Sequence, residues 1–320
     1  MDRPHPIKRQ RTDDLELSRL LEDSTRSTIW FDDGSVILNA ENTLFRVHRS
    51  ILSSHSSVFD DLLGALSSEV QVDGCPVLTV QDSAEDMSHF LKALTDRSYY
   101  REKDAQSIEI TSSILRLSMK YCVDHLRDEA SSRLQYEFPA SLESYDRRTL
   151  GSRIKSGRGY IVDCISLMRE VGLISALPTC FLTLGQYRLP DILNGKLRPD
   201  GSRAILPLED QRICVTGIYE LHVAIAQEMY GWVDIEPGDV RTCKRVGCSD
   251  SRFRLSASLW KPTNDKPLKM LRQWWPEWLV GLCGTCASDA KEEYEAGRRR
   301  IWERLPSFFG LPNWKDMPAQ

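Results

Sequence analysis

The sequence of 320 residues has little that would place it in a membrane, a secreted scaffold or a disordered chain. Its longest apolar run, Trp278 to Cys283, has about six residues, far below the roughly 20 that a membrane-spanning helix needs. The polar, basic start MDRPHPIKRQR is not typical of a secretory signal. Nine cysteines are an odd number, so we expect burial or metal binding instead of a disulfide framework. These features predict a globular protein of the nucleus or cytoplasm without a membrane segment.

The sequence also lacks a strong net charge and a recognisable catalytic motif. Lys and Arg number 42 and Asp and Glu number 46, giving a net charge of 42 − 46 = −4. A mildly acidic chain is not expected to bind nucleic acid over its whole surface. The sequence leaves open that a local basic patch binds it. Because no set of nucleophile, base and oxyanion donor can be named, we expect neither enzyme activity nor a small-molecule substrate.

The length predicts about two domains. We expect a flexible lead at residues 1–26, an α+β domain at 27–140, a linker at 141–160 whose second half, 151–160, is rich in Gly, Arg and Ser, and a mainly helical domain at 161–320 that ends in a tail at 240–320. In the lead, the basic cluster Lys8, Arg9 and Arg11 is either a nuclear address or a solvated tail. The leucines between Leu15 and Leu21 could form a short amphipathic helix.

Short apolar runs and helical periodicities alternate in the first domain. Val36–Leu38 and Leu44–Val47, separated by a polar turn, predict a β-hairpin, and Val77–Val80 predicts a third strand. Helices are predicted within 50–64, with a break near its serines, and at 83–95, 111–121 and 124–136. Ser83 is the expected N-cap of the second of these, with Asp86 three residues later.

His48 follows the second hairpin strand and precedes a helix, so it is predicted to lie at a corner of the chain. A neutral imidazole there could bond backbone groups that the turn leaves unpaired, and we expect a structural histidine instead of a catalytic or metal-binding one. His55 is expected in an exposed loop. Ser56 is expected to cap the helix that leads to Phe59.

The segment FRVHRSILSSHSSVFDDLL, residues 45–63, resembles the signature of the BTB/POZ domain. The residues that carry the resemblance are Phe45, Val47, His48, Arg49, Ile51, Leu52, Ser56, Val58 and Phe59. The segment DGSVILNAENTLFRVHRSIL is similar to the corresponding segment of BTB proteins of mushroom-forming (basidiomycete) fungi. In those proteins a helical region and a cysteine-bearing tail follow the BTB domain. The resemblance implies a small sheet covered by helices, and then a mainly helical region with a cysteine-containing, Trp-rich tail.

BTB domains act by association, so the resemblance implies protein partners and a homodimer or hetero-oligomer, with the leucine stripe of the lead as a candidate exchanged element. It leaves open a substrate adaptor of a cullin-type ubiquitin ligase and a transcription regulator. In dimeric transcription-factor members an Asp on the first strand pairs with the Arg that follows the motif His. Here Ser35 stands at the Asp position and Arg49 is retained, so recruitment through that charged pocket is not expected.

Two cysteine pairs, Cys243-x4-Cys248 and Cys283-x2-Cys286, stand in the tail. Gly284 permits a tight turn between the second pair, and four thiolates from two turns could complete a tetrahedral Zn²⁺ site. Unrelated thiols and a redox Cys-Gly-Thr-Cys pair stay as alternatives. The other cysteines are expected to be packing residues: Cys75, Cys122, Cys164, Cys180 and Cys214.

A helix is predicted after Cys286, with Ala290, Tyr294, Ile301 and Leu305 on one face and Pro306 at its end. Its three arginines, Arg298–Arg300, follow acidic residues that are expected to offset their charge by i,i+4 pairing. DNA contact by a Zn-stabilised tail therefore stays an alternative. The tryptophans of the last 90 residues are expected to pack its core: Trp232, Trp260, Trp274, Trp275, Trp278, Trp302 and Trp314.

Overall fold

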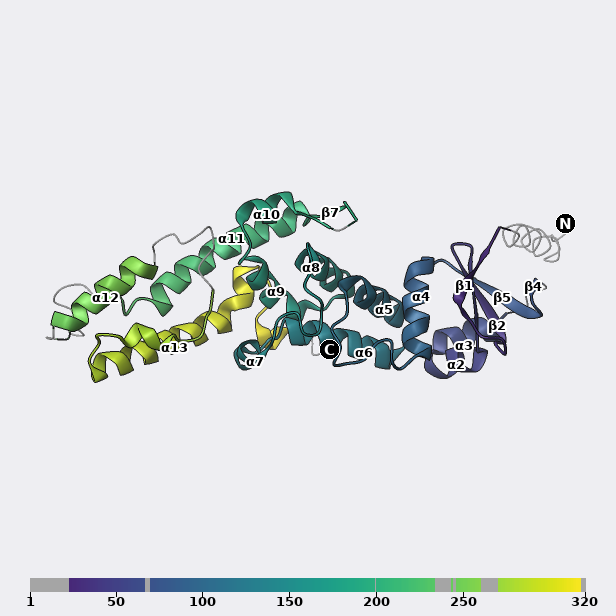
Figure 1. Cartoon of the computed structure of the whole chain (residues 1–320), viewed down its shortest axis with the longest axis horizontal. Coiled ribbons are helices and arrows are strands. Elements are labelled where there is room, and N and C mark those ends of the chain that lie inside the picture. Colours follow the sequence, from purple (N-terminus) through teal and green to yellow (C-terminus); the bar gives the residue numbers. More distant parts are fainter. Residues whose placement is uncertain are drawn as a thin grey trace, which may run out of the picture. The chain divides into compact units, whose positions relative to one another are not determined.

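The computed structural model describes residues 23–66, 70–198, 200–233, 243, 246–259 and 270–317, which form two compact units (Figure 1). The N-terminal unit extends to Arg133 and includes Ser152–Lys155. The C-terminal unit comprises Leu134–Gly151 and the residues from Ser156 onward. The basic cluster at residues 8–11, the leucine stripe at 15–21 and Trp260 lie outside the described residues.

The N-terminal unit is built on a five-stranded sheet. Its strands are β1 (Thr25–Trp30), β2 (Val36–Ala40), β3 (Thr43–Val47), β4 (Gln71–Val72) and β5 (Cys75–Val80). Their order is β1-β3-β2-β5-β4, so β1 and β4 are the edge strands. β1 begins inside the predicted lead; the sequence did not reveal it because only Ile29 and Trp30 in this strand are apolar.

A two-residue turn joins β2 to β3 and confirms the predicted hairpin. Glu41 and Asn42 have φ of 44° and 61°, the left-handed region that a type I′ turn needs at both central positions. All five residues of β2 are buried, and β2 pairs antiparallel with β3 and parallel with β5. A strand covered on both faces is apolar without strict alternation, as Val36–Leu38 is.

Helices complete this unit and confirm the predicted α+β class (Figure 1). They are α2 (Arg49–His55), α3 (Ser57–Gly64), α4 (Ala84–Thr95), α5 (Ile108–Lys120) and α6 (Asp124–Glu137), whose last residues belong to the C-terminal unit. The expected break within 50–64 falls at Ser56. Ser83 caps α4 as predicted, since its hydroxyl accepts the N–H of Asp86 at 3.1 Å.

Residues 141–160 are not the exposed linker that their composition suggested. Leu142–Arg147 form helix α7, and Ile154 is fully buried. Ile154 forms a parallel bridge with Gln106, and the N–H of Lys155 donates to the Gln106 carbonyl at 2.7 Å. A count of Gly, Arg and Ser could not reveal that one apolar side chain returns this segment to the first unit.

The C-terminal unit is mainly helical, as predicted. After α7 it contains α8 (Tyr160–Val171), α9 (Leu177–Leu184), α10 (Leu189–Asn194), the short strands β6 (Lys196–Leu197) and β7 (Arg203–Ala204), α11 (Leu208–Ala224), the π-helical turn η2 (Ile225–Met229), α12 (Val246–Leu259) and α13 (Gly284–Phe308). Short 3₁₀ turns lie at Ile174–Ala176, Pro276–Leu279 and Trp314–Asp316.

Helix α13 continues beyond Pro306, the residue that was expected to end it. Pro306 lies inside the last turn, and the helix ends at Phe308. Proline cannot donate to the carbonyl four residues earlier, that of Trp302. The indole N–H of Trp314 donates to that carbonyl at 2.8 Å, so the freed acceptor is still bonded.

Four of the five cysteines expected in the core are buried: Cys75, Cys164, Cys180 and Cys214. Cys122 is exposed, which corrects the prediction. It follows the end of α5 with φ of 53°, so the chain turns there and directs this residue to the surface. Among the described residues, no helix combines the length and apolarity that crossing a membrane requires.

Candidate functional site

The strand–corner–helix motif of the N-terminal unit supplies core residues from three elements. Phe45 and Val47 alternate on β3 and are each 1% exposed, and Leu52 and Phe59 of α2 and α3 are also buried. Ile51 and Val58 are only half-buried. The motif therefore builds the core and also leaves apolar side chains at the outer surface of α2 and α3.

His48 lies at the predicted corner, but its ring does not bond the backbone. It precedes α2 without a side-chain capping bond, and Nε2 lies 3.4 Å from Oδ1 of Asp33. The ring packs against Phe31 with centroids 5.2 Å apart. The expected backbone contact is wrong because Ser35 takes that role: its hydroxyl accepts the N–H of Arg49 at 3.1 Å.

This contact also defines the position where dimeric transcription-factor BTB domains carry a charge pair. Ser35 and Arg49 are neighbours, but serine contributes a neutral hydroxyl that is already engaged with the Arg49 backbone. Arg49 is exposed, and within the described residues it forms no ion pair. This position therefore carries an exposed cation beside a neutral hydroxyl.

Ser56 links α3 to the distant helix α5. Its hydroxyl accepts the N–H of Phe59 at 2.9 Å, which is the predicted N-cap, and donates to the carbonyl of Tyr121 at 2.5 Å. No local sequence signal identifies the second bond, since 65 residues separate the partners. His55 is exposed, but it ends α2 instead of lying in a loop, and its ring centroid is 5.0 Å from that of His125.

The second site is the cysteine cluster of the C-terminal unit. Cys248 lies in the first turn of α12, Cys283 is the N-cap of α13, Cys286 lies in the first turn of α13, and Cys243 precedes α12. The structure brings all four sulfurs within 4.8 Å of one another. Sequence reasoning missed α12, although Cys248, Ser251, Arg252 and Leu255 recur at helical spacing and face inward.

The distances within the cluster distinguish two kinds of chemistry. Sγ of Cys243 and Sγ of Cys283 are 3.8 Å apart, whereas a disulfide joins its sulfurs at about 2.05 Å. A tetrahedral Zn²⁺ site with Zn–S bonds of about 2.3 Å has its sulfurs about 3.8 Å apart. The spacing therefore matches four ligands around one ion and not two disulfides.

Backbone groups surround these sulfurs. The N–H of Cys283 donates to Sγ of Cys248 at 3.2 Å. The N–H of Cys286 donates to the sulfur of Cys283 and, together with neighbouring thiols, lowers the pKa of Cys283 to about 6. Burial raises the pKa of Cys286 to about 12. The start of α13 therefore favours one thiolate at neutral pH, beside a thiol that stays protonated unless another charge compensates it.

Aromatic rings fill the core of the same unit. Trp274, Trp278 and Tyr230 contact Tyr294 of α13 edge-on, with centroids 5.2 to 5.5 Å apart, and Trp232 is 1% exposed. This confirms the predicted packing role of these residues. Trp275 departs from it, because the residue is 44% exposed and Arg272 lies over its ring.

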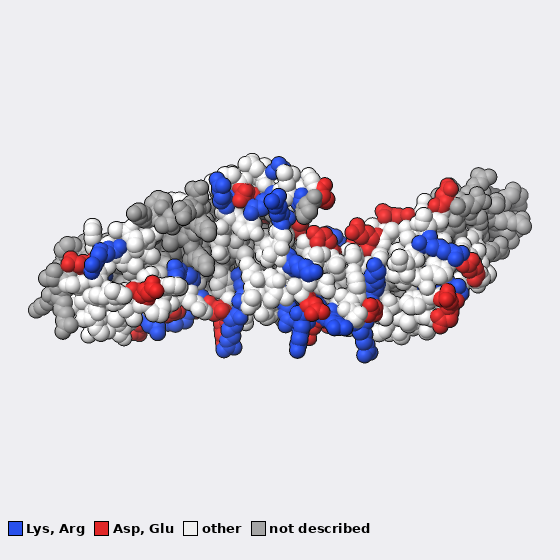
Figure 2. All heavy atoms as spheres, viewed as in Figure 1, with Lys and Arg blue, Asp and Glu red and all other residues white. Residues whose placement is uncertain are grey.

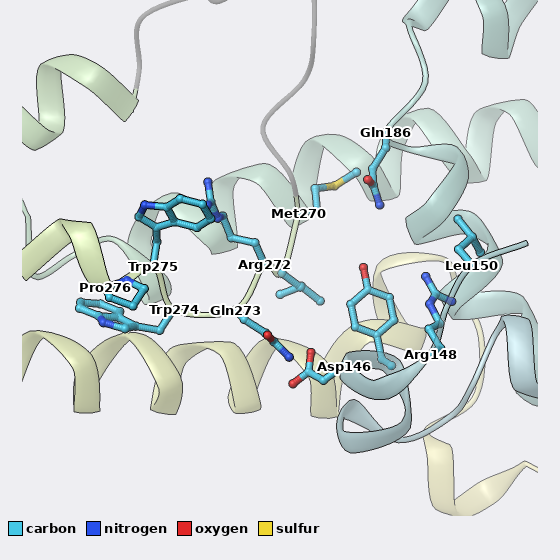
Figure 3. A pocket seen from close by; sticks show the side chains of 12 residues that line it. Asp146, Arg148, Leu150, Gln186, Met270, Arg272, Gln273, Trp274, Trp275 and Pro276 are labelled. Carbon is cyan, nitrogen blue, oxygen red and sulfur yellow. The ribbon is translucent and has the colours of Figure 1, made fainter. Parts of the chain in front are cut away.

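A hollow of about 550 Å³ lies beside this cluster (Figure 3). Gln186, Arg148 and Leu150 form one side, and the segment from Met270 to Pro276 forms the other. Its lining has no serine, threonine, cysteine, lysine or histidine, and its carboxylate, Asp146, is held by Arg298. The lining also contains Tyr145, and burial raises the pKa of its hydroxyl above the usual value.

The arginines of α13 are paired differently from the prediction. Arg298 is 2% exposed and binds Asp146 of α7 with two nitrogens, while Arg300 and Arg304 bind Glu228 of η2. Within α13, Arg298 lies 3.9 Å from Glu295, three residues earlier, and its shorter contacts and those of Arg300 are made to other elements. On the face shown in Figure 2, basic and acidic side chains are interspersed, which is not typical of a phosphate-binding surface.

Residues 27–137 match the family model of the BTB/POZ domain. No curated protein matches the chain. The match covers about a third of the sequence, and it assigns the sheet and helices of the N-terminal unit to this domain. A BTB/POZ domain is generally a protein–protein interaction module and is not typically catalytic. The similarity to the fungal group stays a prediction.

Proposed function

We propose that this protein is an interaction protein whose BTB domain forms homo- or hetero-oligomers, while the C-terminal unit presents a second binding surface, as in an adaptor. The observation that carries the proposal is the BTB match over residues 27–137. Supporting it, α2 and α3 leave apolar side chains at the surface: Ile51 and Val58 are half-buried and Leu62 is 40% exposed. Burial of such side chains against a second copy would provide the apolar centre of an interface.

Sedimentation velocity of the full chain over a range of concentrations tests this proposal. We expect a concentration-dependent dimer, and we expect Val58→Asp with Leu62→Asp to shift it to monomer because charges would be buried without partners. Met119→Asp is the matched control, since Met119 is 42% exposed on α5 of the same unit. A wild-type chain that stays monomeric even at high concentration and binds no other BTB domain would contradict the proposal.

The alternatives from the sequence have less support. A DNA-contacting tail needs free basic side chains, but Arg298, Arg300 and Arg304 are held by carboxylates. Recruitment through the charged pocket needs a carboxylate at Ser35. A role as substrate adaptor of a ubiquitin ligase is a more specific form of the main proposal. Co-purification of the chain with a cullin would test this role. A nuclear or cytoplasmic location would be consistent with either form of the proposal.

We also propose that Cys243, Cys248, Cys283 and Cys286 hold a structural Zn²⁺. The support is the 4.8 Å cluster and the 3.8 Å sulfur separation, which fit a tetrahedral ion. A bound cation would favour the thiolate form of all four side chains, including the buried Cys286. The ion would hold the start of α12 next to the start of α13. In the sequence, 24 residues (260–283) lie between the end of α12 and the start of α13.

Elemental analysis of the purified full chain tests the metal proposal. We expect about one zinc per chain in the wild type and a loss in Cys283→Ala, with Cys122→Ala as the control because Cys122 is an exposed thiol outside the cluster. Metal-free protein that reduces insulin disulfides, and loses this activity in Cys283→Ser, would instead support the redox alternative.

A further inference from the structure

A second hollow of about 550 Å³ lies wholly within the C-terminal unit, between α11 and the segment that enters α10. Its lining is mostly apolar: Gly185, Tyr187, Arg188, Leu189, Pro190, Ile192, Val215, Ile218, Tyr219 and His222. At Gly185 an added Cβ would lie 2.9 Å from Ile218, so the absence of a side chain there lets α11 come close and shapes the floor. The feature is a groove between two packed elements.

Helix α11 carries two apolar faces, and the part of the chain that the structure describes buries one of them fully and the other only in part. Cys214, Gly217 and Leu221 are buried against the rest of the unit. Val215, Ile218, Tyr219 and His222 follow the spacing i, i+3, i+4 and i+7 and form a second face along the groove. Tyr219 is 70% exposed, and Leu189 across the groove is 51% exposed.

Exposed apolar side chains are ordinary when they are scattered. Here Leu189 and Tyr219 line the same groove, and Leu193 and Val223, on the two helices that border it, are also 41% and 39% exposed. A contiguous apolar surface of this kind is typical of a protein interaction site. The spacing on α11 matches the surface that receives another helix, whose side chains would interdigitate at the same repeat.

The charges around the groove indicate which helix it suits. The lining contains Arg188 and His222 but no aspartate or glutamate. At about 100° per residue, Arg212 lies about 60° from Val215, whereas Glu209 and Glu220 lie about 120° and 140° away. Arg188 and Arg212 are exposed, and within the described residues neither binds a carboxylate. The nearest acid on α10, Asp191, is taken by Lys196 at 3.5 Å.

We propose that this groove binds an amphipathic helix of a partner protein that has an apolar stripe flanked by acidic residues. The stripe would pack on Tyr219, Ile218 and Leu189. The flanking carboxylates would meet Arg188 and Arg212 at the edges, where charge pairs favour the correct partner and speed association. The site goes beyond BTB-mediated oligomerisation, because every lining residue belongs to the other unit.

Fluorescence anisotropy with the full-length chain tests the proposal. The probe is a fluorescein-labelled synthetic helix with leucines at i, i+3, i+4 and i+7 and glutamates elsewhere. The comparison probe has lysines in place of the glutamates. We expect saturable binding of the acidic probe and at least tenfold weaker binding of the basic one. Tyr219→Ala and the double variant Arg188→Glu with Arg212→Glu should each weaken the acidic probe about tenfold. The double variant should also remove the preference for the acidic over the basic probe.

Matched controls separate the groove from general surface effects. Phe253→Ala removes an aromatic side chain that is 76% exposed on α12, and Arg299→Glu reverses an exposed arginine on α13. Both should bind the acidic probe like the wild type.

The proposal is overturned if the wild type shows no saturable binding, or if the groove variants bind as the controls do. Self-association that Tyr219→Ala abolishes would overturn it in favour of a second copy in the groove. Val58→Asp with Leu62→Asp should leave probe binding unchanged, so a failure of the BTB oligomer is distinguishable.

Discussion

Helix α5 in the N-terminal unit and helix α13 in the C-terminal unit both bury polar side chains, but they satisfy them in different ways. In α5 the hydroxyls of Thr111, Ser112 and Ser118 each donate to a carbonyl three or four residues earlier. In α13 the partners are distant: Tyr294 donates to the carbonyl of Arg272, Trp302 to that of Ala140, and Arg298 binds Asp146.

The two helices therefore depend on different contacts for their stability. A hydroxyl that bonds its own helix is satisfied as soon as the helix forms, so the contribution of α5 to stability depends mainly on the burial of its apolar side chains. The polar groups of α13 are satisfied only when separate segments are in place. The packing of α13 should therefore be sensitive to changes in single polar contacts, and the packing around α5 to changes in apolar volume.

The largest expected effect breaks the apolar core of the N-terminal unit. Phe59 is fully buried and stacks on Tyr121 with ring centroids 4.2 Å apart. Phe59→Ala should lower the free energy of unfolding of this unit by about 3–5 kcal/mol, because it removes buried surface and leaves a cavity. Hydrogen exchange resolved by peptide should show the loss in residues of the N-terminal unit. An equal loss in both units would contradict the comparison.

A slightly smaller effect is expected from the distant ion pair of α13. Arg298 has a side chain only 3% exposed and is bound by Asp146. Asp146→Ala should cost the C-terminal unit about 3 kcal/mol, since the buried guanidinium loses the carboxylate that binds two of its nitrogens. Chemical denaturation followed by tryptophan fluorescence reports on this unit. Glu143→Ala, which removes an exposed pair with Arg147 on the same helix, should change the midpoint little.

Two glycines test how closely the helices approach. A Cβ added at Gly297 of α13 would lie 1.9 Å from the carbonyl oxygen of Glu228. A Cβ added at Gly64 of α3 would have no surrounding atom within 4 Å. Gly297→Ala should destabilise its unit by about 1–3 kcal/mol through overpacking. Gly64→Ala should stabilise the BTB domain by about 0.5 kcal/mol, since alanine favours helix. Thermal unfolding of both variants gives the two signs, and a stabilised Gly297→Ala would rule out the close approach.

The smallest expected effect is a pH dependence of the BTB domain. Burial lowers the pKa of His89 and of His125 below their usual value of 6.5. The unfolded chain then takes up protons first as the pH falls through about 6.5, so acidification should destabilise this unit. Hydrogen exchange at about pH 7.5 and about pH 5.5 measures the change, and His89→Gln should reduce it. Greater protection at the lower pH would show that the sign is wrong.

Much of the BTB domain was predictable because its signals are local. The hairpin turn at Glu41 and Asn42, the cap at Ser56 and the cap at Ser83 each depend on residues within a few positions of one another. The side-chain role of His48 was not predictable in the same way. Its contact with Asp33 depends on the path of the loop between β1 and β2. The hydroxyl of Ser35, and not the His48 ring, accepts the backbone N–H of Arg49.

The metal-ligand candidates show the same limit. The spacing of Cys283 and Cys286 within one turn suggests two ligands, but 34 residues separate Cys248 from Cys283. Only the start of α12, which the sequence analysis missed, brings Cys248 to the N-terminus of α13. The second apolar face of α11 was also absent from the prediction, because periodicity does not say which of two faces the rest of the chain covers.

Local residue patterns were enough to predict the elements whose geometry closes within a few residues: a two-residue turn, an N-cap, and an apolar strand followed by a helix. Tertiary structure decided which distant groups meet, including the return of Ile154 to the first unit and the Trp314 indole that bonds the carbonyl freed by Pro306. Short-range hydrogen bonds have few geometric alternatives. Long-range contacts must offset the entropy of ordering the chain between them, so they depend on the packing of the whole unit.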